Sequence, residues 1–118
     1  MSIFKDQAKF MQACGQSTDE MNIEQARLYA GLIHEEFNEL LDSVTEENEV
    51  KELMDLIVVL VGYGLSSGWD LEGAWKEVMR TNFAKIDKET GKVRKREDGK
   101  VLKPTGWTPP DLKPYVKK

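Results

Sequence analysis

The sequence contains very little cysteine and histidine. Cys14 is the only cysteine and His34 the only histidine among 118 residues. A lone cysteine excludes a disulfide within the chain, and without a cluster of Cys and His side chains the common zinc patterns are excluded as well. A reducing, cytoplasmic location is therefore expected. His34 is interpreted as a helix-surface residue rather than a catalyst.

Long hydrophobic runs are also missing. The most apolar window, residues 56–65, is too short to span a bilayer. The opening residues, MSIFKDQAKF, lack a basic region followed by an apolar run, so no export signal is expected. The sequence thus predicts a soluble protein with no membrane partner. At 118 residues, one domain with a modest core is expected, and a second subunit would help to bury its surface.

Charge is unevenly distributed along the chain. The net charge is −4, but residues 1–84 hold sixteen acids and six bases, whereas residues 85–118 hold five acids and eleven bases. This change places a boundary after Ile86, between a helical core (residues 1–86) and a basic loop or arm of the same domain (residues 87–118). Because an acidic body repels a polyphosphate backbone, nucleic-acid binding is not expected. The basic arm is either a solvated surface or a contact for a single nucleoside triphosphate.

Hydrophobic periodicity predicts an all-α protein, a bundle of four to five helices with antiparallel central helices. Four longer helices are expected, over residues 3–14, 23–43, 46–66 and 71–86. Their ends coincide with residues that commonly cap or terminate helices: Gly15, Asn22 with Gln25 as a capping box, Thr45, Gly68 and Asp70. After the helices, turn signals and prolines predict a small hairpin or an extended arm. Trp107 and Tyr115 would dock this arm on the bundle or on a neighbouring subunit.

Two pairs of carboxylates are the main chemical feature. Glu36 and Glu39 are three residues apart, as are Glu52 and Asp55, and residues at this spacing are neighbours on a helix, roughly 5 to 6 Å apart at Cβ. If the central helices are antiparallel, four pairs of residues face each other: Leu28 with Tyr63, Leu32 with Val59, Glu36 with Asp55, and Glu39 with Glu52. The main apolar stripes lie on other faces, at Ile23, Ala26, Ala30, Ile33, Phe37, Leu40 and Val44 and at Val50, Leu53, Ile57, Val61 and Gly64.

Four facing carboxylates repel one another and are costly to bury, unless cations neutralise them or their pKa values rise. Oxygen ligands without thiolate or imidazole favour Mg²⁺, with Mn²⁺ as the alternative. A ferritin-like di-iron site would need a Glu-x-x-His motif on each of two helices, which this sequence does not have. Two interpretations remain: a divalent-metal site, or a solvated acidic face on a non-catalytic helical interaction module such as an antitoxin-like or phage accessory protein.

The same residues resemble the motifs of the all-α nucleoside triphosphate pyrophosphohydrolases, which include MazG-like proteins, dimeric dUTPases and phosphoribosyl-ATP pyrophosphohydrolases. That family carries EExxE followed, after a spacer, by ExxD, and this sequence matches it with five acids: Glu35, Glu36, Glu39, Glu52 and Asp55. The segment RTNFAK also looks like the family's Asn-x-x-Lys element, at Asn82 and Lys85. The resemblance extends from about Ala26 to Lys85.

The resemblance implies that all five acids are catalytic. The Mg²⁺ ligands would be Glu36, Glu39, Glu52 and Asp55. Glu35 would assist the metal site or the attacking water, and Asn82 and Lys85 would contact the sugar or phosphate. The implied assembly is a homodimer or homotetramer, and the implied reaction is Mg²⁺-dependent hydrolysis of a nucleoside triphosphate to a monophosphate and pyrophosphate, as in house-cleaning of the nucleotide pool. The substrate stays open among dUTP, dCTP, a damaged nucleotide and phosphoribosyl-ATP.

Overall fold

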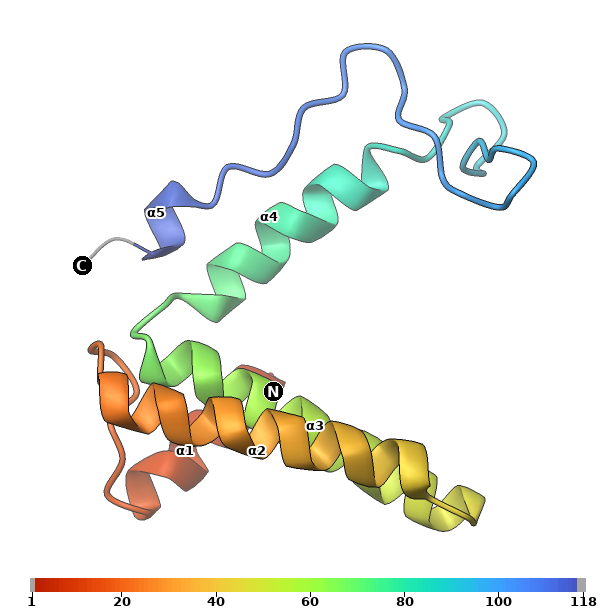
Figure 1. The fold of residues 1–118 in the computed structure, drawn as a ribbon. Helices are drawn as coiled ribbons and strands as arrows, with labels where there is room; N and C mark the ends of the chain where they lie inside the picture. The colour runs from red at the N-terminus through yellow and green to blue at the C-terminus, as the bar shows by residue number, and fades with distance from the viewer. Residues whose placement is uncertain (1, 117–118) are drawn as a thin grey trace. The chain divides into compact units, whose positions relative to one another are not determined.

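The computed structural model describes residues 2–116, and this part of the chain contains five helices and no strand. The helices are α1 (Ile3–Ala13), α2 (Ile23–Asp42), α3 (Glu46–Ser66), α4 (Leu71–Phe83) and the short α5 (Lys113–Val116) (Figure 1). The all-α prediction is confirmed, and α2 and α3 are antiparallel and pack closely. None of the described helices is both long and apolar enough to cross a membrane. The chain divides into two compact units, one of residues 2–71 with Val116 and the other of Glu72–Tyr115.

Local signals at the helix ends act as the sequence predicts. The side chain of Asn22 accepts a hydrogen bond from the Gln25 N–H at 3.1 Å, and that of Thr45 accepts one from the Asn48 N–H at 3.2 Å. Just after α1, Gly15 adopts a φ of 76°, a left-handed conformation that glycine reaches without steric cost. The two N-terminal caps satisfy N–H groups that have no partner within the helix. The starts of α2 and α3 therefore agree with the prediction.

The fourth helix is shorter than predicted. It ends at Phe83 rather than at Ile86. Ile86 instead forms an isolated antiparallel bridge with Val93, and Lys95 forms another with Val101. Because a residue paired with an extended segment must leave the helical conformation, the backbone departs from α4 before Ile86. The small hairpin expected after the helices is present as these two bridges.

Gln25 differs from the capping-box prediction. Instead of binding back to Asn22, its amide group donates to the Ser17 carbonyl at 2.7 Å and to the Ser66 hydroxyl at 2.8 Å, and it accepts from the Ser17 N–H at 3.0 Å. Gln25 is buried, and a buried amide is stable only when its polar atoms have partners. It therefore joins the loop after α1 to the C-terminal end of α3.

The core of the first unit lies where α1, α2 and α3 meet. Its buried members are Met11 from α1, Tyr29 from α2, and Val59, Val61 and Leu65 from α3. Leu32 and Tyr63 pack against this cluster. Of the residue pairs expected to face each other across the helices, Leu32 with Val59 therefore contributes to the core, whereas Leu28, the expected partner of Tyr63, is 53% exposed.

The main apolar stripe predicted for the second helix is only partly buried. Its members include Ile23, Phe37 and Val44, which are 58%, 48% and 93% exposed. The face of α2 that packs combines Ala26 and Ile33 from this stripe with Tyr29 and Leu32, which lie outside it. The packing face is therefore continuous with the line on which Glu36 and Glu39 lie.

In the second unit, the C-terminal arm lies along α4. The indole Nε1 of Trp107 donates to the Thr81 carbonyl at 2.7 Å, and the backbone N–H of Asp111 donates to Glu77 at 2.8 Å. Arg80 holds the same carboxylate through two contacts of 2.8 and 2.9 Å. Trp107 thus docks the arm on a helix, as the sequence predicts.

Replacing Glu77 with alanine is expected to loosen the arm, because the Asp111 N–H and the Arg80 guanidinium both lose an anionic partner. These two contacts, Arg80 first, hold the pKa of Glu77 at about 2. A carboxyl whose pKa is depressed on folding adds stability above its unfolded value of 4.5, and this stability is lost as the pH falls through about 2. Amide hydrogen exchange at Asp111 should therefore show less protection in Glu77→Ala, and in the wild type as the pH falls through this window.

Glu97→Ala is the matched control, since Glu97 is exposed between the bridged residues Lys95 and Val101 and precedes the segment that docks on α4. It should leave the protection of Asp111 unchanged. Equal protection in Glu77→Ala and the wild type would show that the arm does not depend on this carboxylate.

Candidate active site

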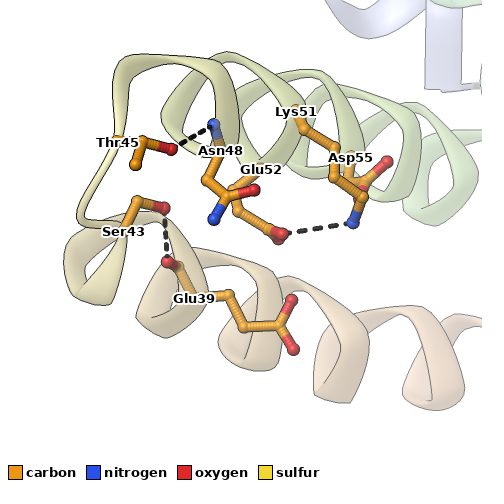
Figure 2. A network of polar contacts seen from close by, with 7 residues as sticks. All are labelled: Glu39, Ser43, Thr45, Asn48, Lys51, Glu52 and Asp55. Carbon is orange, nitrogen blue, oxygen red and sulfur yellow. Dashed lines mark hydrogen bonds and ion pairs between the residues drawn. The ribbon is translucent and has the colours of Figure 1, made fainter.

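The two carboxylate pairs lie near the turn that joins α2 to α3 (Figure 2). Ser43 closes α2, with its hydroxyl donating to the Glu39 carbonyl at 2.9 Å, and Thr45 begins α3 by capping its first turn. Because the connection is so short, α3 must return along α2, and residues equally far from the turn face each other. Figure 2 shows Glu39 on one helix and Glu52 on the other, with the side chain of Glu52 directed toward α2.

Three of the four predicted metal ligands form one group. Carboxylate oxygens of Glu36, Glu39 and Glu52 all lie within 4.8 Å of one another. Asp55 is partly buried beside them, and its carboxylate is held by Lys51 at 2.9 Å. The antiparallel register expected from the sequence therefore brings the acids of the two helices together.

Two oxygens of this group lack a hydrogen-bond donor. Within residues 2–116, Glu36 Oε2 and Glu52 Oε2 are buried and accept no hydrogen bond. A buried, charged oxygen without a donor is destabilising, so a proton or a cation must compensate it. The donor set consists of carboxylate oxygens only, which is typical of sites for hard divalent cations such as Mg²⁺ or Mn²⁺. The residues present therefore fit a divalent cation between α2 and α3.

The pKa values of these carboxyls also show that their negative charges are poorly compensated. Burial raises the pKa of Glu36 to about 7, with further contributions from the neighbouring carboxyls of Glu52 and Glu39 and from the charge of Asp55. Between Glu39 and Glu52, the pKa of Glu39 is raised and that of Glu52 is lowered, as expected when two adjacent carboxyls share one proton. Near neutral pH the group thus favours a bound positive charge.

The other predicted site residues lie outside this group of three. Glu35 is exposed on α2. His34 is also exposed, 3.3 Å from the side-chain amide of Asn38, in keeping with its interpretation as a surface residue. Asn82 and Lys85 belong to the second unit, where the Lys85 ammonium donates to the Asn82 side-chain oxygen at 3.1 Å.

Further basic side chains accompany the predicted site residues in each of the two units. Lys85 borders a cavity of about 350 Å³ whose lining also includes Lys88 and Arg94. In the first unit, Lys51 contacts two of the predicted ligands, Glu52 and Asp55. The spacing of Lys51 and Asp55, four residues apart on one helix, is the signal that could have identified it.

A known protein family matches the part of the chain that contains this site. The model of the phosphoribosyl-ATP pyrophosphohydrolase family matches residues 7–82, a span that includes both carboxylate pairs. A comparison with curated protein sequences gave no significant match. The match covers more than half of the chain and agrees with the superfamily expected from the EExxE and ExxD motifs. The chain belongs to the phosphoribosyl-ATP pyrophosphohydrolase family, within the all-α superfamily of hydrolases that act on pyrophosphate bonds.

Proposed function

We propose that this protein is a Mg²⁺-dependent pyrophosphohydrolase that converts a nucleoside triphosphate to a monophosphate and pyrophosphate. One observation carries the metal dependence: acids from two helices converge, and two of their buried oxygens, Glu36 Oε2 and Glu52 Oε2, have no donor among the described residues. Family membership supports cleavage of a pyrophosphate bond. A solvated acidic face on a non-catalytic module would not require carboxylate oxygens to be buried without a donor, as those of Glu36 and Glu52 are.

The ligands of the metal would be Glu36, Glu39, Glu52 and Asp55. When bound, Mg²⁺ or Mn²⁺ neutralises phosphate charge and lowers the pKa of water, so that water can attack the phosphoanhydride. Glu35, next to Glu36 in the sequence but exposed, would assist the metal site or hold a proton of the attacking water. The packing of α2 on α3 keeps these acids at fixed separations, which is the protein's contribution to orienting the reaction.

The contacts to sugar or phosphate would come from Asn82 and Lys85. Lys85 keeps Asn82 oriented through their 3.1 Å hydrogen bond, and it lines a cavity together with Lys88 and Arg94. No ion pair with an acid is found for these three cations among the described residues. Their charge is therefore available to an anionic ligand.

Lys85→Ala is expected to lower kcat/KM by about tenfold or more, because a hydrogen bond to a charged group contributes roughly 1.5–3 kcal/mol. Steady-state kinetics on the best substrate would measure this loss. Lys100→Ala removes the same charge from an exposed position of the basic segment and should have little effect. If Lys85→Ala retains the wild-type kcat/KM, Lys85 does not bind phosphate.

A homodimer or homotetramer is the proposed assembly. Several large apolar side chains of α2 and α3 are exposed, among them Phe37 and Leu60, each close to half exposed, and Leu41 at 65%. Burying such surface against a second copy would be favourable by about 25 cal/mol per Å². Sedimentation equilibrium is expected to show an oligomer at micromolar concentration, and a stable monomer would contradict this assembly.

A panel of nucleotides, assayed for pyrophosphate release with Mg²⁺ and with a chelator, tests the function. We expect release from at least one of dUTP, dCTP, a damaged nucleotide or phosphoribosyl-ATP, and none with the chelator. Activity on a canonical or damaged triphosphate would support nucleotide house-cleaning, whereas strict preference for phosphoribosyl-ATP would indicate a biosynthetic role. Absence of release from every member, together with absence of metal binding, would favour the interaction module instead.

A further inference from the structure

Lys51 forms ion pairs with two of the proposed metal ligands. Its ammonium lies 2.9 Å from Asp55 Oδ2 and 3.1 Å from Glu52 Oε1 (Figure 2). Among the ion pairs of the described residues, Lys51 alone provides a positive charge to the cluster of acids formed by Glu36, Glu39, Glu52 and Asp55. Lys51 is therefore the internal counter-ion of an otherwise acidic group.

The lysine and the orphaned oxygens use different atoms of the same carboxylate. Lys51 contacts Glu52 Oε1, whereas Glu52 Oε2 is buried and has no donor. The side chain of Lys51 is 65% exposed, while that of Glu52 is only 14% exposed. The lysine thus approaches from the solvent side and leaves the inner oxygens available, and an exposed lysine side chain can return to water at little cost.

A divalent cation and Lys51 would compete for the same negative charge. The ammonium offsets the repulsion among the carboxylates, so it stabilises the metal-free protein. For the same reason it lowers the attraction that a divalent cation experiences at Glu52 and Asp55, because like charges a few ångströms apart repel. The carboxylates therefore bind each cation more weakly when the other is present.

We propose that Lys51 is a resident counter-cation, which holds Glu52 and Asp55 in place before the metal arrives and is displaced from them when the metal binds. In this role it is a positioning residue that sets the metal affinity of the site. The inference rests on the proposed function, since it assumes that these carboxylates bind a divalent cation.

Isothermal titration calorimetry with Mg²⁺ or Mn²⁺ on the full chain tests this role. Lys51→Met keeps the unbranched apolar stem of the side chain and removes the charged end. The variant should bind the metal roughly five- to tenfold more tightly, in line with the free energy of two exposed ion pairs. Lys51→Arg keeps the charge and should behave like the wild type. Lys9→Met removes one positive charge from an exposed position on α1 and should also leave the Kd unchanged.

Thermal unfolding supplies a second, independent readout. In chelator, Lys51→Met should unfold at a lower temperature than the wild type, because the carboxylates lose their counter-ion. Saturating metal should reduce or remove this difference, since the bound cation takes over the neutralising role. A merely structural lysine would lower the unfolding temperature equally with and without metal.

The outcomes separate the two proposals. If the wild type and Lys51→Met bind the metal with the same Kd, or if the variant binds more weakly, the displacement of Lys51 is wrong while the metal site stands. If neither the wild type nor any Lys51 variant binds metal, the metal site itself is wrong, and the role of Lys51 is rejected with it.

Discussion

Glu52→Gln is expected to abolish Mg²⁺-dependent pyrophosphate release while leaving the helices formed. Glutamine has nearly the same shape as glutamate, but it carries no charge and replaces one oxygen by an N–H₂ group that cannot bind a cation. Glu52 is the member of the group that contributes a buried, unpartnered oxygen from α3. Because loss of a residue that merely supports a metal ligand already costs about 10–100-fold, loss of a ligand should cost at least about a hundredfold.

The same substitution should not unfold the protein, which makes the result interpretable. Removing one charge from a group of mutually repelling carboxylates relieves repulsion in the metal-free state. Circular dichroism and thermal unfolding in chelator should therefore be close to those of the wild type. The stabilisation that Mg²⁺ gives the wild type should disappear.

Glu47→Gln is the matched control for this experiment, because Glu47 is exposed in the first turn of α3 and lies outside the carboxylate group. It should retain activity and metal binding. Asp55→Asn should behave like Glu52→Gln if Asp55 is a ligand. Full activity in both Glu52→Gln and Asp55→Asn would overturn the assignment of the site.

Gly62→Ala is expected to destabilise the first unit by about 1–3 kcal/mol, the usual cost of overpacking a core. A Cβ at this position would meet the buried ring of Tyr29, with the ring carbon Cζ only 2.7 Å away. The ring cannot easily withdraw, because its hydroxyl donates to Gln16 at 2.7 Å. Urea or thermal unfolding would measure the loss.

Gly31→Ala provides the control, since a Cβ there would meet no atom within 4 Å. Alanine is favoured over glycine inside a helix by up to about 1 kcal/mol, so this variant should be as stable as the wild type or more stable. If Gly62→Ala unfolds at the wild-type midpoint, the close approach of α2 to α3 at Tyr29 is not required.

This contact also bears on the active site. Tyr29 opposes Gly62 in the same antiparallel register that sets Glu39 opposite Glu52. Helices forced apart at Gly62 would therefore separate the carboxylates farther along the pair. We expect Gly62→Ala to weaken metal binding even at temperatures where the variant is folded.

The sequence by itself determined the features that depend on neighbouring residues. The capping side chains of Asn22 and Thr45 act within one turn, so the starts of α2 and α3 could be predicted from short segments. The spacing of Glu36 and Glu39 places both on one side of a helix for the same reason. Because the segment between the two helices is short, the second helix must run antiparallel to the first, and the acids that face each other could be predicted for this reason. The roles of Glu35, Asn82 and Lys85 remain predictions.

Only the tertiary structure decided which groups are buried and what they contact. Gln25 looked like part of a local cap, but its amide binds Ser66, which is 41 residues away in the sequence. The pKa of Glu36 rises because its carboxyl is desolvated and because the carboxyl of Glu52, on another helix, lies beside it. The ion pairs of Lys51 with Glu52 and Asp55, by contrast, lie within about one helical turn, so the spacing of these residues could have predicted them. Burial depends on segments that meet only after folding, so no local pattern in the chain encodes it.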